Sequence, residues 1–255
     1  MRAALLYNPK LIIERLALSI SRKKRFMRLK NTSAYSLTLG HIDSLELLEL
    51  VKAENPIKVI YDIGANVGTW SILSKAIFPK AKVFAFEPLQ PHIEEFYNNT
   101  KDLENIILYP YALGSKKEMS KINISSFSDS SSLLPSTQLL NETYNISTID
   151  AIEIQVLRLD DLFDETSILI QPDLIKLDIQ GYELEALKGA EKILKKTKYI
   201  IMEVSFLEYY KGQPLFEEVI VYMNKQNFKV KAFGQNTPIG QNLTQIDILF
   251  ANNNL

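Results

Sequence analysis

The 255-residue sequence contains no cysteine, two histidines and one tryptophan. The absence of cysteine excludes disulfide bonds, thiolate metal sites and a cysteine nucleophile. Histidine, the usual general base, is limited to His41 and His92. No apolar run reaches the roughly 18 residues that a transmembrane helix needs. Any chemistry must therefore come mainly from other side chains.

The overall charge is nearly balanced, with 29 basic and 30 acidic residues. This balance provides no global positive field, so a nucleic acid is not an expected partner. Nine of the basic residues and one of the acidic residues fall within residues 1–30, which leaves the rest of the chain acidic. The hydrophobic content of 46% and the charged content of 23% are typical of a globular protein with one core.

Residues 1–55 are predicted to form a basic helical extension. Within it, residues 10–30 carry apolar residues at helical spacing and then the basic run Arg22-Lys23-Lys24-Arg25. This basic face is either solvated or paired with the acidic body, or it contacts an anionic membrane surface or an acidic substrate. A second short helix is expected over residues 44–53. The N-terminus lacks the apolar region of a signal peptide, so we expect a cytoplasmic protein, or one at the inner face of the membrane.

Residues 56–255 alternate between apolar strands and amphipathic helices. Strands are predicted at 58–64, 82–88, 106–113, 173–179 and 199–205, and helices at 67–78, 90–101, 183–195 and 215–227. This alternation is typical of a doubly wound parallel sheet with helices on both faces. Residues 229–235 and 244–252 are expected to pair antiparallel, because no helix separates them.

The interval 119–159 departs from this alternation and is predicted to be a hairpin-like insertion. Its serine-rich segment, residues 125–136, is either a mobile surface loop or a lid that orders over the substrate.

The stretch VIYDIGANVGTW, residues 59–70, predicts a strand, a glycine-bearing turn and a helix. Such turns usually bind phosphates, but this one is not GxGxxG, and Asp62 would repel a pyrophosphate. A cationic nucleoside ligand without phosphates suits the turn better, and S-adenosylmethionine (AdoMet) is such a ligand. Glu87 ends the next strand, about twenty residues on, where an acid commonly binds ribose hydroxyls. The alternative is that both acids only cap the helices that follow them.

Several ordered motifs within residues 58–252 resemble the FkbM family of AdoMet-dependent O-methyltransferases. They are DIGANVG, FAFEP, YALG at 111–114, the SSSL segment, RLDDLF at 158–163 and IKLDIQGYELEALKGA at 175–190. The resemblance implies a class I methyltransferase fold, a Rossmann-like seven-stranded sheet whose last strand is antiparallel. It also implies methylation of hydroxyls on sugars of surface polysaccharides, lipopolysaccharides and nodulation factors, or on polyketides.

The resemblance also implies a cofactor site, position by position. The residues expected around the methionine part of AdoMet are Asp62, Gly64, Asn66 and Gly68. Glu87 is expected to bind the ribose. The residues expected to flank the adenine are Pro88, Leu89, Ala112 and Leu113.

Candidate catalytic residues lie in and near the strand DLIKLDI. The two-residue period of a strand puts Lys176 and Asp178 on one face, and charges on a buried strand must be paired or functional. Asp178 is our candidate base or metal ligand, with an ion pair to Lys176 as the alternative. With Glu183 and Glu203 it could supply an oxygen-rich Mg²⁺ or Ca²⁺ site, although Glu183 could equally cap its helix.

Two further features bear on the catalytic site. His41 is a second candidate base that could reach over the pocket, and Glu203 could share the site with Asp178. The family most often has an acid two residues after the aspartate, where this chain has Gln180. That departure weakens the case for a metal, whereas an amide can still bind substrate.

The sequence therefore predicts an AdoMet-dependent O-methyltransferase that acts on a sugar hydroxyl in cell-surface glycan synthesis. The acceptor would be nucleotide-linked or lipid-linked, and a homodimer is a further expected association. The alternatives are the same reaction on a polyketide or other small secondary metabolite, and a non-catalytic AdoMet-binding module.

Overall fold

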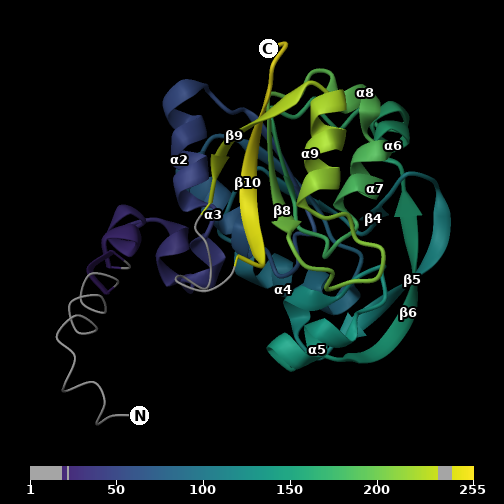
Figure 1. Ribbon diagram of the computed structural model, residues 1–255. Helices are drawn as coiled ribbons and strands as arrows, with labels where there is room; N and C mark the ends of the chain where they lie inside the picture. The colour runs from purple at the N-terminus through teal and green to yellow at the C-terminus, as the bar shows by residue number, and fades with distance from the viewer. Residues whose placement is uncertain (1–18, 22, 235–242) are drawn as a thin grey trace, which may run out of the picture.

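The computed structural model describes residues 19–21, 23–234 and 243–255, and a seven-stranded sheet lies at its centre (Figure 1). The strands, in spatial order, are β3 (Ile106–Tyr109), β2 (Lys82–Phe86), β1 (Val59–Ile63), β7 (Leu174–Leu177), β8 (Tyr199–Ser205), β10 (Gln245–Asn252) and β9 (Phe228–Phe233). The first five pair in parallel, and β10 pairs antiparallel with both β8 and β9. The predicted fold class is confirmed.

Helices cover both faces of this sheet, as Figure 1 shows. One face carries α2 (Leu45–Glu54), α3 (Thr69–Ile77) and α4 (Gln90–Thr100). The other carries α6 (Leu159–Glu165), α7 (Glu183–Lys188), α8 (Glu191–Leu194) and α9 (Phe216–Lys225). Strand β2 shows why both faces of the sheet are covered. Phe84 and Phe86 pack toward α7 and α8, whereas Val83 and Ala85 pack toward α3 and α4. A strand that is buried on both faces must be apolar throughout, which is the pattern that the sequence displays.

Two predicted elements are divided in the structure. The strand predicted over 106–113 is wrong in its second half, because β3 ends at Tyr109, before Pro110, and β4 (Ala112–Leu113) belongs to a second sheet. The helix predicted over 183–195 is interrupted at Gly189. A Cβ at Gly189 would lie 2.0 Å from the carbonyl oxygen of Gly114, so this close approach requires glycine.

The insertion is a hairpin, as predicted. Its strands β5 (Glu118–Ser125) and β6 (Thr148–Leu157) pair antiparallel and form a three-stranded sheet with β4. The connection between them contains a 3₁₀ turn, η4 (Ser128–Ser130), and the helix α5 (Gln138–Tyr144), which the sequence did not predict. Helix α6 was not predicted either. Both helices have only seven residues, too few for a clear hydrophobic period.

The N-terminal segment packs against the same face of the sheet as α3. Residues 19–21 and 23–28 are helical, and the 3₁₀ turns η2 (Ser33–Ser36) and η3 (Gly40–Ile42) follow them. Leu29, Ala34 and Ile42 are fully buried in one apolar cluster with residues of α2, α3 and β1. Residues 1–18 of the predicted extension lie outside the described residues, and the predicted boundary at residue 55 stays a prediction. In the described part of the chain, no helix has the length and apolarity needed to cross a membrane.

Asp160 in the RLDDLF motif joins α6 to α8. Its carboxylate accepts hydrogen bonds from the backbone N–H groups of Lys192 (2.8 Å) and Ile193 (3.1 Å), and its side chain is buried. The neighbouring Asp161 has a side chain that is 45% exposed, and within the described residues it forms an ion pair with Arg158. The first aspartate of this motif therefore has a structural role.

Replacing Asp160 with alanine is expected to lower the free energy of unfolding by roughly 1–3 kcal/mol, because two backbone donors lose their acceptor. Asp161→Ala should change it by no more than about 0.5 kcal/mol, as surface substitutions do. Urea denaturation of both variants measures the difference. Equal effects of the two substitutions would contradict the assignment.

Candidate active site

Three carboxylates lie at one edge of the parallel sheet. Asp62 is the second-last residue of β1, Glu87 directly follows β2, and Asp178 directly follows β7. Ile63 pairs with Phe86 on one side and with Leu177 on the other, so the three strands end at the same level. The carboxyl ends of parallel strands are where open α/β sheets bind ligands.

The backbone turn after β1 comes very close to the turn after β7. Gly64 has φ +81°, and a Cβ there would lie 2.0 Å from the carbonyl oxygen of Asp178. Asn66 also has a positive φ, +47°, which asparagine tolerates better than most residues. The glycine and the asparagine of DIGANVG therefore shape the turn itself.

Two adjoining cavities lie at this edge of the sheet. The smaller one, of about 590 Å³ and open to solvent, lies beside this turn. All of the residues predicted to contact ribose and adenine line it: Glu87, Pro88, Leu89, Ala112 and Leu113. Gly64, Asn66 and Asp178 also line it, at the edge nearest β1. The cavity thus combines an apolar wall with one buried carboxylate, Glu87.

Glu87 is held in position by the backbone. It accepts hydrogen bonds from the N–H groups of Asn66 (3.0 Å) and Leu89 (2.9 Å), one on each carboxylate oxygen. His92 Nδ1 lies 3.4 Å from Glu87, and interaction with Glu87 raises the pKa of His92 although burial opposes it. Each carboxylate oxygen can accept a second hydrogen bond, so Glu87 can still bind a ligand hydroxyl.

A larger cavity, of about 1600 Å³ including space open to solvent, adjoins the smaller one, and both are lined by Gly64, Asn66, Asp129, Asp178 and Gln180. The predicted residues His41, Asp62 and Glu203 line only the larger cavity. Its aromatic lining residues are Trp70, Phe127, Tyr144 and Tyr210. Its other charged lining residues are Asp43, Lys176 and Asp247. Two adjoining cavities that share one polar border suit two ligands that meet there.

Asp62 is 1% exposed and accepts a hydrogen bond from the Ser71 hydroxyl, at 2.6 Å. Burial raises the pKa of Asp62 to about 6, although Ser71 and Lys176 favour its charged form. Asp62 is thus still mostly ionised at neutral pH, although burial disfavours its charged form.

Lys176 lies among the carboxylates that line the larger cavity. It is 3% exposed, and its Nζ lies 3.1 Å from Asp178 Oδ2. Burial lowers the pKa of Lys176, but nearby carboxylates led by Asp178 and Asp247 outweigh it and raise the pKa overall. The predicted Lys176–Asp178 ion pair therefore exists, and Asp178 remains exposed enough to line both cavities.

Glu203 lies on β8, next to Asp178. In the strand register, Leu177 lies opposite Met202, so Asp178 and Glu203, the next residues of the two segments, are neighbours. Glu203 in turn lies opposite Asp247 of β10. Burial, followed by the charges of Asp178 and Asp247, raises the pKa of Glu203 well above its ordinary value. The row of carboxylates thus continues from β1 to β10.

The serine-rich segment packs over the border between the cavities. Asn66 donates to Asp129 Oδ1 (3.0 Å), and Ser132 donates to the carbonyl oxygen of Gln180 (2.7 Å). Gln180 in turn donates to Asp178 Oδ1 (2.8 Å), and the Tyr210 hydroxyl lies 2.9 Å from Gln180 Oε1. The segment is therefore placed as the predicted lid would be, against the residues that both cavities share.

Two predicted site residues lie apart from both cavities. Gly68, with φ +89°, precedes α3, and a Cβ there would lie 2.9 Å from the Phe96 ring. Glu183 Oε1 accepts from the N–H groups of Ile179 (2.9 Å) and Gly181 (3.1 Å). Glu183 therefore stabilises the turn before α7, and its two backbone donors belong to that turn and not to the helix.

The carboxylates do not fit the predicted Mg²⁺ or Ca²⁺ site. Within residues 19–21, 23–234 and 243–255, no three imidazole or carboxylate groups come together as metal ligands. The ammonium group of Lys176 already lies beside Asp178, and Glu183 Oε1 is occupied by two backbone donors.

Several lining residues of the larger cavity were not predicted, among them Asp43, Trp70, Asp129 and Asp247. Asp247 had a usable signal, because it is an acid within the apolar strand QIDILF. Asp43 and Asp129 come from turns, and no periodicity marks their direction.

Asp62→Asn is expected to stabilise the fold at neutral pH. A carboxylate whose pKa rises from 3.8 in the unfolded chain to about 6 in the folded one weakens the fold as pH rises between these values. Removing its charge should add up to roughly 3 kcal/mol to the free energy of unfolding at pH 7.5 and almost nothing at pH 4. Urea denaturation at both pH values measures this, with the exposed Asp161→Asn as control. A gain that does not depend on pH would contradict the burial argument.

Comparison with known proteins identifies the family. The model of the methyltransferase FkbM domain matches residues 62–230. Hexuronic acid methyltransferase AglP of Haloferax volcanii is 31% identical over 165 residues, which cover 65% of this chain and 62% of AglP. The 2-O-methyltransferase NoeI of Sinorhizobium fredii is 30% identical over 167 residues, which cover 63% of this chain and 68% of NoeI. The chain thus matches less than two thirds of the length of AglP.

A solved structure shares the fold. A chain of a fibrillarin/Nop5p complex superposes with a TM-score of 0.50 at 17% identity, covering 88% of this chain and 91% of that one. The family model matches more than half of the chain, including every residue that lines the smaller cavity and most that line the larger one, and shows that the chain belongs to the FkbM methyltransferase family.

Proposed function

We propose that the chain is an AdoMet-dependent O-methyltransferase that methylates a sugar hydroxyl in cell-surface glycan synthesis. The observation that carries the proposal is the border between the two cavities, where Asp178 faces both. The relatives support the substrate class, because AglP is named for a hexuronic acid and NoeI for 2-O-methylation.

The smaller cavity suits the nucleoside part of AdoMet, and its methionine part would extend past Gly64 and Asn66 into the larger cavity, which Asp62 lines. The buried, ionised carboxylate of Asp62 attracts the cationic groups of this cofactor and would repel a pyrophosphate. Glu87 would accept hydrogen bonds from the ribose hydroxyls, and the apolar residues Leu89 and Leu113 would contact the adenine. When bound there, AdoMet supplies the methyl group, which passes to the acceptor oxygen as its bond to sulfur breaks.

The larger cavity suits a glycan acceptor. Its carboxylates can accept hydrogen bonds from sugar hydroxyls, and aromatic side chains such as Trp70, Tyr144 and Tyr210 offer apolar faces for a sugar ring. Asp178 would take the proton of the attacking hydroxyl, a contribution of about 10²–10⁴-fold. Lys176 and Gln180 each contact one Asp178 oxygen, so they fix the orientation of this carboxylate.

The charge of the larger cavity favours a neutral or amino sugar as acceptor. Asp43, Asp129 and Asp247 line it with the carboxylates of the sheet edge, and Lys176 is already paired with Asp178. Like charges at short distance repel, so a uronic acid would bind less well than an uncharged hexose. The hexuronic acid in the name of AglP therefore does not transfer directly to this chain.

A panel of acceptors tests the function. We expect S-adenosylhomocysteine to form from AdoMet with p-nitrophenyl hexosides or UDP-linked hexoses, and less with a p-nitrophenyl glucuronide. Asp178→Asn should lower kcat by about 10²–10⁴-fold, because the base is lost, and leave the AdoMet Kd within about threefold, because asparagine keeps the size of the side chain that lines both cavities. Asp161→Asn is the matched control.

Turnover of a hydroxylated macrolactone in place of any sugar would support the polyketide alternative. If no acceptor is methylated although AdoMet binds, the proposed activity fails and the non-catalytic AdoMet-binding module is favoured. Full kcat in Asp178→Asn would remove the proposed base.

A further inference from the structure

We propose that residues 40–44 form a wall that positions the acceptor, and that Arg25 is the positioning residue that holds this wall. The inference rests on the proposed function, since it names the part of the chain that shapes the acceptor site. Below, these five residues are called the acceptor wall.

The acceptor wall contributes to one cavity only. Gly40, His41, Asp43 and Ser44 line the larger cavity, and none of them lines the smaller one. They also precede residue 62, where the match to the family model begins. The shared methyltransferase core therefore supplies the smaller cavity, whereas the larger one is completed by the N-terminal segment of this chain.

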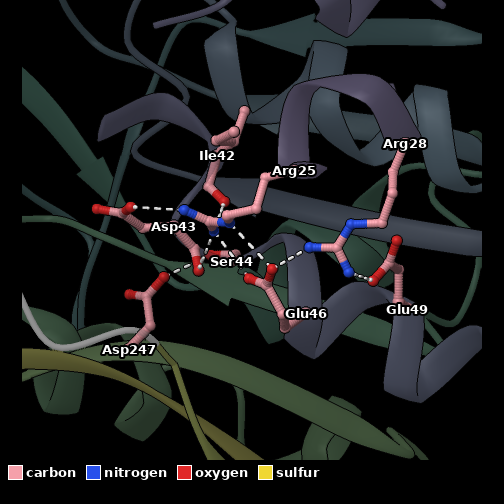
Figure 2. Close-up of polar contacts among 8 residues, drawn as sticks. All are labelled: Arg25, Arg28, Ile42, Asp43, Ser44, Glu46, Glu49 and Asp247. Atoms are coloured by element: carbon pink, nitrogen blue, oxygen red, sulfur yellow. Dashed lines mark hydrogen bonds and ion pairs between the residues drawn. The ribbon is translucent and has the colours of Figure 1, made fainter. Parts of the chain in front are cut away.

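Arg25 contacts the acceptor wall but does not line the larger cavity, and Figure 2 shows its contacts with Ile42, Asp43 and Glu46. Its guanidinium group is 5% exposed and donates to both Glu46 oxygens, from Nε at 2.9 Å and from Nη2 at 2.8 Å. Nη2 also donates to the carbonyl oxygen of Ile42, and Nη1 lies 3.8 Å from Asp43 Oδ1. One buried side chain thus joins helical residues 23–28 to η3 and to α2.

The geometry of these contacts requires arginine. A guanidinium group offers five N–H donors in a planar fork, whereas a lysine ammonium is a single point charge. Burying the guanidinium away from water is favourable only with partners such as Glu46 and the carbonyl oxygen of Ile42. Loss of the fork would therefore release the wall.

The other end of the acceptor wall is bound to the sheet. The Ser44 hydroxyl donates to the carboxylate of Asp247 (Figure 2). Asp247 lies on β10, opposite Glu203 of β8 in the strand register. Ile42, between the two ends, is fully buried. The wall is thus held at three points, and Asp43 and His41 are directed to the cavity between them.

Arg28 provides a matched control on the same helix. It has the same charge and shares Glu46 with Arg25, and its Nη1 lies 2.7 Å from Glu49 Oε2 (Figure 2). Its side chain is 40% exposed, and both of its partners belong to α2. It makes none of the contacts with Ile42 and Asp43 that Arg25 makes.

The experiment compares wild type, Arg25→Ala, Arg25→Lys and Arg28→Ala in the full chain. We expect Arg25→Ala to raise the KM for a p-nitrophenyl hexoside at least fivefold, with kcat and the AdoMet Kd within about twofold of wild type. Arg25→Lys should shift the KM in the same direction, and it remains the test if Arg25→Ala does not fold. Arg28→Ala should behave as wild type.

A second readout needs no acceptor. Trp70, the single tryptophan, lines the larger cavity, so acrylamide quenching of its fluorescence reports whether the wall is closed. Quenching should increase in both Arg25 variants and stay unchanged in Arg28→Ala.

Three results would overturn the inference: Arg25 and Arg28 variants that behave alike, an AdoMet Kd that weakens as much as the acceptor KM, or unchanged Trp70 quenching. If wild type methylates no sugar, the proposed function fails separately, and quenching alone then decides whether Arg25 holds the wall.

Discussion

The buried ammonium group of Lys176 is the interaction on which the site depends. It is surrounded by the carboxylates of Asp62, Asp178, Glu203 and Asp247, which come from four different strands or strand ends. Without a cation among them, their mutual repulsion and burial would be strongly unfavourable. With it, the carboxyl ends of β1, β7 and β8 and the beginning of the antiparallel β10 can meet at one acidic edge.

This arrangement gives the edge an electrostatic preference. Asp62 stays mostly ionised at neutral pH although it is buried, which costs stability and creates an attraction for a cationic ligand. Burial first, and then the charges of Asp178 and Asp247, raise the pKa of Glu203 well above its ordinary value, although Lys176 lowers it. In the proposed function, the same field would favour a sulfonium cofactor and disfavour a negatively charged acceptor, so one set of carboxylates would act on both ligands.

The sequence predicted the fold and the sheet edge because their causes are local. Apolar strands alternating with helices require a parallel sheet, and acids at the ends of such strands must meet at one edge. Asp62, Glu87 and Asp178 were placed there by this reasoning. The direction of a single side chain was harder to predict: Glu183 begins a helix, and the same residue type in the same position can cap the helix or face a ligand.

The acceptor side depends on contacts between distant parts of the chain, which no local pattern encodes. Ser44 and Asp247 are 203 residues apart, and Ser132 and Gln180 are 48 apart. The helix α5 and the turn η4 are short and polar, so hydrophobic periodicity could not reveal them. The break of the strand at Pro110, by contrast, had a readable signal, because proline lacks the N–H group that a central strand needs.

Isothermal titration of the purified protein with AdoMet and with NAD tests the central claim most directly. The account predicts that AdoMet binds with micromolar affinity, that NAD does not bind, and that Asp62→Ala loses AdoMet binding, because the buried carboxylate is what attracts a cationic nucleoside and repels a pyrophosphate. Binding of NAD, or AdoMet affinity that is unchanged in Asp62→Ala, would contradict it.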